Sequence, residues 1–304
     1  MPTNELLITE AGKVREKWGK SEANLKQDLQ ILKDWLKTQK HLPKVPDDRI
    51  IELLLTNCKY SLEMTKTHLD MYFTVRSLMP EVFDQSHPKQ SKHQSIYSLI
   101  DYVVLPKLTD SLHRISLMRF KENSAEKLNL LHIVTYGTNL YELRIRHNDI
   151  VMGEVIILDC QHFNMGHVMK FTPAALKKCM LVSEKVWGSR IKEFHVINHS
   201  PAIDAILTVA KGILSKKLYN RIFLHHTYDG LLEKIPKDLL PSDFCGDQKS
   251  IKELIDLLKL KFEECSDEFD ELQKLKVDEK LRPEPLNNSE VLGYYGNFKK
   301  LDVD

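Results

Sequence analysis

Short strand-like runs alternate with helical segments between residues 114 and 230, and this alternation constrains the fold more than any other feature of the sequence. The clearest run, EVIILD at residues 154–159, is a continuous apolar run that ends on a carboxylate, which is typical of a buried strand. Further strands are predicted at 114–120, 193–198 and 221–226, with helices at 125–147, 173–187 and 202–217 and from Gly230. Strands separated by helices at this spacing predict an α/β fold with a largely parallel sheet and right-handed crossovers.

The first hundred residues have a helical pattern instead. Four leucines at three- and four-residue steps form one apolar stripe: Leu25, Leu29, Leu32 and Leu36. Asp47 and Ser61 are placed to cap two further helices. We therefore divide the chain into an all-helical N-terminal domain (1–95), an α/β domain (96–262) and a C-terminal tail (263–304) whose aromatic residues dock on the body.

The charges and cysteines of the chain limit its partners and its compartment. The 304 residues include 44 Lys and Arg against 43 Asp and Glu, a formal net charge of +1. A protein that coats long nucleic acid normally has a clear basic excess, so no nucleic-acid partner is expected. The cysteines form no CxxC pair, the N-terminus lacks a signal-peptide pattern, and no apolar run reaches the roughly 18 residues of a membrane span. These features predict a reduced, cytoplasmic location.

The motifs of several enzyme classes are absent. Neither GxGxxG nor GxxxxGK[ST] occurs, and the bulky residues 160–163 follow the strand at 154–159 where a phosphate-binding turn would lie. No GxSxG nucleophile motif occurs, and Ser200 reads as the start of a helix. His225 and His226 are adjacent on a predicted strand and so point to opposite faces. We therefore predict no catalytic residue, no cofactor and no metal site.

The segment 201–214 has a broad apolar face and further apolar residues beyond it. The face is formed by Ile203, Ile206, Leu207, Ala210, Ile213 and Leu214, and Ala202 and Val209 extend the apolar character around the helix. One explanation is a crossover helix that is buried on most sides. The other is a surface-active helix, and the residues alone leave both explanations open.

Four basic residues form another informative pattern. Arg190 and Lys192 are two apart in an extended stretch and share a side, whereas Lys217 and Arg221 share a face if the preceding helix continues through them. A basic cluster beside an apolar helix is suited to an anionic membrane surface. The alternative is a set of unrelated charges in contact with solvent.

Several sequence motifs follow one another in a distinctive order. They are VIILD at 155–159 with Gly166-His167, FTPAALKK at 171–178, IKEFHVIN at 191–198 with Pro201, and LPSDFCG at 240–246. In this order and spacing they resemble the CRAL-TRIO lipid-binding family, over residues 20–262. The ending GYYGNFKKL at 293–301 resembles the tails of insect-type members. The resemblance implies an all-helical N-terminal domain followed by an α/β domain, whose mostly parallel sheet floors an apolar pocket closed by a gate helix that begins near Pro201.

The resemblance also implies which residues line this pocket. They are Thr135, Tyr136 and Leu140 on the helix at 125–147, Ile156, Leu158 and Phe194 on the strands, Phe163, then Cys179, Val182, Ser183 and Trp187 on the next helix, and Ile206 and Leu207 on the gate helix. Several of these residues are equally suited to an ordinary hydrophobic core.

The same resemblance places four residues where the family holds phosphoinositide head groups: Arg190, Lys192, Lys217 and Arg221. An arginine-containing stretch of the family's N-terminal domain reads LLTNCK at 54–59 here, so its arginine is absent. This departure puts the strength of phosphoinositide binding in question but does not affect the expected fold.

These implications describe a carrier, and not an enzyme, that binds a small hydrophobic lipid of the tocopherol, retinoid, carotenoid or sterol type. It would exchange this lipid at anionic, phosphoinositide-containing membranes as a cytoplasmic monomer. One alternative is a phosphoinositide-binding trafficking adaptor without a transferred ligand. Another is a lipid-converting enzyme that uses Asp159 or a histidine.

Overall fold

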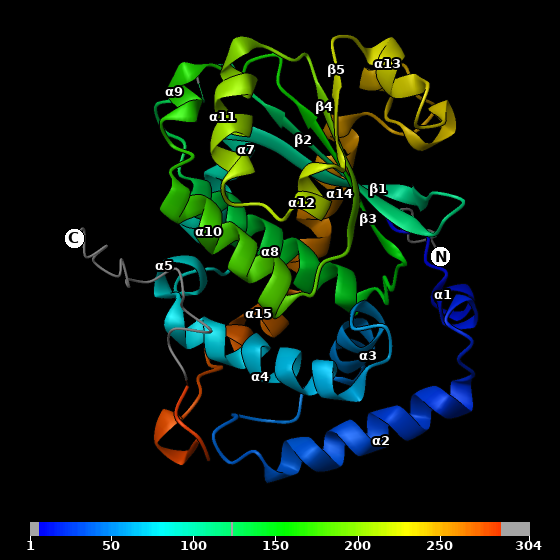
Figure 1. Ribbon diagram of the computed structural model, residues 1–304, viewed down its shortest axis with the longest axis vertical. Coiled ribbons are helices and arrows are strands. Elements are labelled where there is room, and N and C mark those ends of the chain that lie inside the picture. The colour runs from blue at the N-terminus through cyan, green and yellow to red at the C-terminus, as the bar shows by residue number, and fades with distance from the viewer. Residues whose placement is uncertain (1–5, 123, 287–304) are drawn as a thin grey trace, which may run out of the picture.

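The computed structural model describes residues 6–122 and 124–286 (Figure 1). The helical N-terminal part lies at the bottom of this view, and the α/β part lies above it. The aromatic residues at 294–298, for which docking on the body is predicted, lie outside the described residues. Within the described ranges, no helix has both the length and the apolar character needed to cross a bilayer.

The N-terminal part begins with four helices, and three of them start at a capping side chain. They are α1 (Ala11–Lys17), α2 (Glu22–Thr38), α3 (Asp48–Asn57) and α4 (Leu62–Leu78). The side chains of Ser21, Asp47 and Ser61 accept hydrogen bonds from backbone N–H groups in the first turns of α2, α3 and α4, which confirms the predicted caps at Asp47 and Ser61. The leucine stripe of α2 is buried in the core that α2 shares with α3 and α4. Three short helices then lead to the sheet: α5 (Pro80–Phe83), α6 (Ser91–Gln94) and α7 (Ile96–Leu99).

The α/β part is built on a sheet with the strand order β1-β2-β3-β4-β5. The strands are β1 (Ile100–Leu108), β2 (His113–Phe120), β3 (Gly153–Asp159), β4 (Ile191–Ile197) and β5 (Ile222–His225). Strands β2 to β5 pair in parallel, whereas β1 is antiparallel to β2. The expected α/β fold with a mostly parallel sheet is therefore confirmed. Strand β1 is absent from the sequence prediction because Asp101, Pro106 and Lys107 interrupt its apolar pattern.

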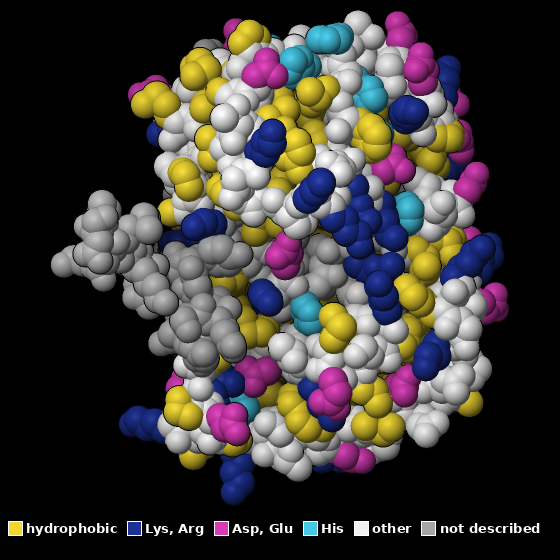
Figure 2. All heavy atoms as spheres, viewed as in Figure 1, with side chains coloured by type: hydrophobic (Ala, Val, Ile, Leu, Met, Phe, Trp, Pro, Cys, Tyr) yellow, Lys and Arg dark blue, Asp and Glu magenta, His cyan; other side chains and the backbone are white. Residues whose placement is uncertain are grey.

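Further helices pack around the sheet. They are α8 (Leu130–Arg146), α9 (Met165–Val168), α10 (Pro173–Leu181), α11 (Pro201–Lys211), α12 (Lys216–Tyr219), α13 (Tyr228–Leu232), α14 (Ile251–Glu264) and α15 (Ser266–Gln273). Helix α11 lies in front of the strands in Figure 1, α8 and α10 lie below it, and α14 packs against β1. On the same face of the molecule, Figure 2 shows hydrophobic side chains over α9 and α11 and a group of Lys and Arg side chains beside α12.

Two long helices differ from their predicted extents. The helix predicted at 202–217 is divided, because α11 ends at Lys211 and α12 begins only at Lys216. Lys217 and Arg221 therefore do not share one continuous helical face, which corrects the expectation drawn from their spacing. The helix predicted at 173–187 changes after α10 into a π-helical turn, Val182–Val186.

Candidate functional site

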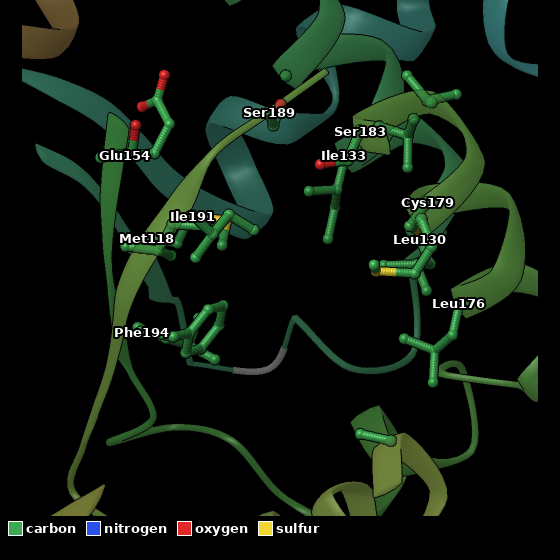
Figure 3. A pocket seen from close by; sticks show the side chains of 18 of the residues that line it. Met118, Leu130, Ile133, Glu154, Leu176, Cys179, Ser183, Ser189, Ile191 and Phe194 are labelled. Carbon is green, nitrogen blue, oxygen red and sulfur yellow. The ribbon is translucent and has the colours of Figure 1, made fainter. Parts of the chain in front are cut away.

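A cavity of about 360 Å³ lies between the sheet and helices α8, α10 and α11 (Figure 3). Small-molecule pockets typically measure about 300–1,000 Å³, so the cavity can hold a ligand of modest size. Most of the side chains that line it are aliphatic or aromatic. The shape and the lining together favour an apolar ligand.

The floor of the cavity follows from the register of the sheet. Two rows of paired residues cross β2, β3 and β4: Ser116, Ile156 and Phe194, then Met118, Leu158 and Val196. Residues two apart on a strand point to the same face, so both rows line the cavity. Val155 and Ile157, which alternate with them on β3, are fully buried and are not part of the lining.

The opposite wall is formed by α8 and by α10 with its π-helical turn. Thr172 caps α10 by accepting a hydrogen bond from the backbone N–H of Ala175. The π-helical turn contributes Val182 and Ser183 to the cavity, and Trp187 follows it directly. Single π-turns inside helices often mark functional sites. Here the turn brings Trp187 into a lining position where the ring is only 1% exposed.

Helix α11 closes the remaining side of the cavity. Ile203 is buried, whereas Ile206 and Leu207 also line the cavity but are only half-buried. Helix α9 packs on α11, and Met165 and Met169 next to it are 56% and 78% exposed. Helix α11 therefore directs apolar side chains toward the cavity, and exposed methionines lie beside it at the surface. It is neither a fully buried crossover helix nor a purely superficial one.

One end of the cavity carries charged side chains that are balanced in sign. Arg144 and Glu154 belong to the lining, and Arg144 donates hydrogen bonds to Glu154 at 2.9 and 3.3 Å. Arg144 and Arg114 both donate to Asp149, at 2.6 Å and 3.1 Å. Burial raises the pKa of Glu154, and the positive charge of Arg144 opposes this shift. The result is a compact group of two guanidinium groups and two carboxylates.

A separate pocket of about 320 Å³ opens beside the cavity, and we call it the basic pocket. Its lining includes one acidic residue, Glu184, and five basic residues: Lys59, Arg190, Lys192, Lys217 and Arg221. Partial burial lowers the pKa of Lys192, and the positive charges of the other four lower it further. A bound polyanion would relieve this repulsion, so the basic pocket is suited to an anionic group. The corresponding dark blue side chains in Figure 2 lie beside α12.

Lys59 of the basic pocket is not indicated by the sequence patterns. It follows α3 with a positive φ of 56° and lies in the pocket together with Asn57. Lys59 ends the stretch 54–59 in which the family arginine is missing, so the N-terminal part still supplies one positive charge. A comparison of residues 54–59 with the arginine-containing stretch of the family could have identified Lys59.

The cavity and the basic pocket share part of their walls. The shared residues are Met180, Ser183, Ser189, Ile191 and Leu218. A single layer of side chains therefore separates the apolar interior from the site suited to an anion.

Three residues that the sequence prediction placed in the pocket lie outside the cavity: Thr135, Tyr136 and Phe163. The hydroxyl of Tyr136 donates to the carbonyl of Tyr102 on β1, and the hydroxyl of Thr135 donates to the carbonyl of Val82 on α5. Phe163 packs in an aromatic cluster beyond the end of β3. Thr135 and Tyr136 lie outside the lining because the rotation of α8 directs them away from the cavity, and Phe163 lies outside it because it follows the end of β3.

The other predicted residues line the cavity: Leu140, Ile156, Leu158, Cys179, Val182, Ser183, Trp187, Phe194, Ile206 and Leu207. The lining also includes residues that were not predicted, among them Met118, Phe120, Leu130, Ile133, Phe171 and Leu176. The period-two pattern of β2 could have indicated Met118 and Phe120, because they alternate with buried core residues on that strand.

A helix-covered, mostly parallel sheet beside an apolar cavity defines an α/β protein with a site suited to an apolar ligand. Comparison with known proteins agrees with this class: residues 100–246 match the CRAL/TRIO domain, and residues 21–93 match the description "Pinta-like, UBA domain". Residues 100–246 therefore form a CRAL/TRIO domain, and proteins of the CRAL-TRIO family generally bind and transfer lipids.

Curated relatives and a solved structure extend this comparison. Proteins named "Alpha-tocopherol transfer protein-like" from Homo sapiens and Pongo abelii are each 25% identical over 224 residues, which is 72% of this chain. The match spans 65% of the length of these relatives. The crystal structure of Sfh5 has a TM-score of 0.50 at 9% identity, covering 84% of this chain and 100% of that chain, and so shows the same fold.

Proposed function

We propose that this protein is a cytoplasmic, monomeric carrier that binds one small hydrophobic lipid beneath α11 and transfers it at anionic membranes. The observation that carries the proposal is the apolar cavity of about 360 Å³ closed by α11. The general role of the family and the name of the curated relatives support it. Tocopherol-, retinoid-, carotenoid- and sterol-like lipids are the ligand classes that suit such a cavity.

The energetics of burial favour release at a membrane. Burial contributes about 0.8 kcal/mol per CH₂, so a chain of about fifteen carbons contributes on the order of 12 kcal/mol. Escape of such a lipid into water would be very slow. If α11 moves aside while it contacts a bilayer, the lipid avoids water, and the exposed Met165 and Met169 beside α11 would support that contact.

The basic pocket would hold the membrane's anionic head groups, of which phosphoinositides are the proposed class. Each Lys or Arg near an anionic surface contributes about 1 kcal/mol, whereas a net charge of +1 gives little long-range attraction. The basic side chains and the apolar side chains over α9 and α11 lie on one face in Figure 2, so a single orientation could engage both. The basic pocket would also serve an adaptor that transfers no lipid.

Organic extraction of the purified protein, followed by mass spectrometry, separates these functions. A stoichiometric lipid, either copurified or taken up from lipid vesicles, supports the carrier. Protein that remains free of lipid under both conditions contradicts the carrier and favours the adaptor, and chemically altered lipid would indicate an enzyme. An Ile156→Trp variant, which fills the cavity floor, is the control and should stay folded but lose the lipid.

A further inference from the structure

We infer that the lipid held in this cavity is uncharged and carries a hydroxyl group, which hydrogen-bonds with Thr138 and Trp187 beside Glu154. The inference rests on the proposed carrier function and specifies the chemical class of the ligand. The apolar lining alone selects no class, so the polar atoms in the lining decide it.

Two polar atoms in the cavity wall lack a partner. The hydroxyl of Thr138 and the indole N–H of Trp187 make no hydrogen bond with any residue in the described part of the chain. Thr138 is 4% exposed and Trp187 is 1% exposed, and both residues line the cavity. Buried polar groups in folded proteins are nearly always paired, so these two atoms point to a bound molecule that supplies the missing partners.

Thr138 and Trp187 are both neighbours of Tyr141. Thr138 precedes Tyr141 by three residues on α8 and so lies on the same side of that helix. The ring of Trp187 stacks on the ring of Tyr141, with centroids 5.1 Å apart and planes at 12°. The hydroxyl of Tyr141 lies 3.2 Å from Glu154 Oε1 and 2.9 Å from Ser189 Oγ. The hydrogen-bonding groups therefore gather in one region of the cavity.

The close-up of the cavity agrees with this arrangement. In Figure 3, Glu154 and Ser189 lie toward the same end of the pocket, whereas Phe194 and Leu176 lie toward the other. An elongated lipid could thus place its polar end beside Glu154 and its chain along the apolar remainder.

The charges at the polar end select against an ionised ligand. The guanidinium groups of Arg114 and Arg144 are paired with the carboxylates of Asp149 and Glu154, and each residue is at most 6% exposed. A fatty-acid carboxylate or an ammonium group would add an unpaired charge to this buried, balanced group, which is unfavourable.

A hydroxyl group matches the hydrogen-bonding capacity of the site. The indole N–H of Trp187 only donates, the Thr138 hydroxyl both donates and accepts, and the Glu154 carboxylate accepts. A lipid hydroxyl can accept from Trp187 while it donates to Thr138 or Glu154. An ether or a ketone oxygen can accept from Trp187 and Thr138, but it has no proton to donate to Glu154.

Three probes with the same alkyl chain test the inference: hexadecanol, hexadecyl methyl ether and palmitate. Their affinities for the purified full chain can be measured by titration calorimetry at neutral pH. We expect hexadecanol to bind about tenfold more tightly than the ether and than palmitate.

Two threonines on α8 provide a matched pair of variants. Thr138→Val keeps the side-chain shape, so it should reduce the preference for hexadecanol over the ether without lowering the melting temperature. Trp187→Phe should reduce the same preference. Thr135→Val is the control, because that hydroxyl bonds to the Val82 carbonyl at 2.8 Å outside the cavity. It should lower the melting temperature and keep the full preference.

The possible results separate this inference from the carrier proposal. Equal affinities for alcohol and ether, or tighter binding of palmitate, would overturn the hydroxyl inference and leave the carrier intact. An unchanged preference in both Thr138→Val and Trp187→Phe would overturn it as well. If none of the three probes binds, the carrier proposal fails and the inference fails with it.

Discussion

Trp187 connects the cavity with the N-terminal helices. Its ring lines the cavity and makes an edge contact with Tyr72 on α4, with centroids 5.7 Å apart. Its backbone carbonyl accepts a hydrogen bond from the side-chain amide of Asn57 at 2.7 Å. The environment of this ring therefore depends on the content of the cavity and on the position of the N-terminal helices.

Lipid binding should change the tryptophan fluorescence, and Trp187→Phe should remove most of that change. Of the three tryptophans in the chain, only Trp187 lines the cavity. Phenylalanine keeps an aromatic ring at this position, so the variant should remain folded. Trp35→Phe on α2 is the control and should keep the response; if it abolished the signal instead, Trp187 would not be the residue that senses the lipid.

Trp18 should report on the basic pocket in the same way. The guanidinium group of Arg190 lies over the Trp18 ring, 4.7 Å from its centroid, so an anion that engages Arg190 alters the surroundings of the indole. We expect a soluble inositol phosphate to change the fluorescence of the wild type and of Trp187→Phe, but not of Trp18→Phe. A response that persists in Trp18→Phe would locate the anion elsewhere.

Among the elements, α11 has the apolar surface on which the proposed gate depends. Leu207→Asp should yield a folded protein that no longer docks on anionic vesicles, because Leu207 is half-buried. Ile203→Asp, on the buried side of the same helix, should cost several kcal/mol or unfold the protein, because it places an unpaired charge in the core. Circular dichroism melts and vesicle sedimentation compare the two. Unfolding of both variants would contradict a gate at Leu207.

Elements with a strong local signal were predictable from the sequence. The caps at Asp47 and Ser61 and the apolar run at 154–159 each depend on a few neighbouring residues. The break after Lys211 was not predictable, because the apolar pattern continues across Gly212. The π-helical turn at Val182–Val186 also has no compositional signal, since it depends on how α10 packs.

The candidate site was predictable to the extent that it follows these local patterns. Ile156 and Leu158 line the cavity because strand alternation and register place them there. Tyr136 does not, because the rotation of α8 relative to the sheet is set by packing with β1. Lys59 joins the basic pocket through a positive φ after α3, a contact between distant segments that periodicity does not reveal.

At the scale of the whole molecule, a buried ion pair joins the N-terminal helices to the α/β part. Arg76 on α4 pairs with Glu142 on α8, and the Tyr72 hydroxyl donates to the same carboxylate at 2.8 Å. Glu142→Ala would leave the Arg76 charge without this partner, so urea denaturation should show a loss of about 3–5 kcal/mol. Glu271→Ala, which removes an exposed ion pair, should cost much less. Similar losses from both variants would contradict a structural role for the buried pair.

The basic pocket draws charges from distant parts of the chain, and its role can be tested by reversing two of them. Lys59 and Lys217 are both exposed, whereas Arg221 donates a hydrogen bond to the carbonyl of Ile191 and is less suited to replacement. Lys59→Glu combined with Lys217→Glu changes the local charge by four units, equivalent to about 4 kcal/mol or nearly a thousandfold in membrane partitioning. Sedimentation with phosphoinositide vesicles should show this loss, while the affinity for the lipid stays the same.

A second pair of lysines provides the control for net charge. Lys13→Glu combined with Lys17→Glu makes the same change in total charge, but both residues line a different surface groove. This variant should bind vesicles nearly as well as the wild type. Equal losses from the two pairs would indicate a diffuse charge effect and not a specific head-group site.

Because the cavity lies between the sheet and α11, a bound lipid should make the folded protein more resistant to unfolding and proteolysis. A lipid that binds only the folded chain raises the free energy of unfolding, by about 2.7 kcal/mol at a hundredfold excess over Kd. The unfolded population that proteases attack then falls by about a hundredfold. We therefore expect the cellular abundance of the proposed carrier to rise and fall with the supply of its lipid. The amount of carrier protein would then report how much of the lipid is available.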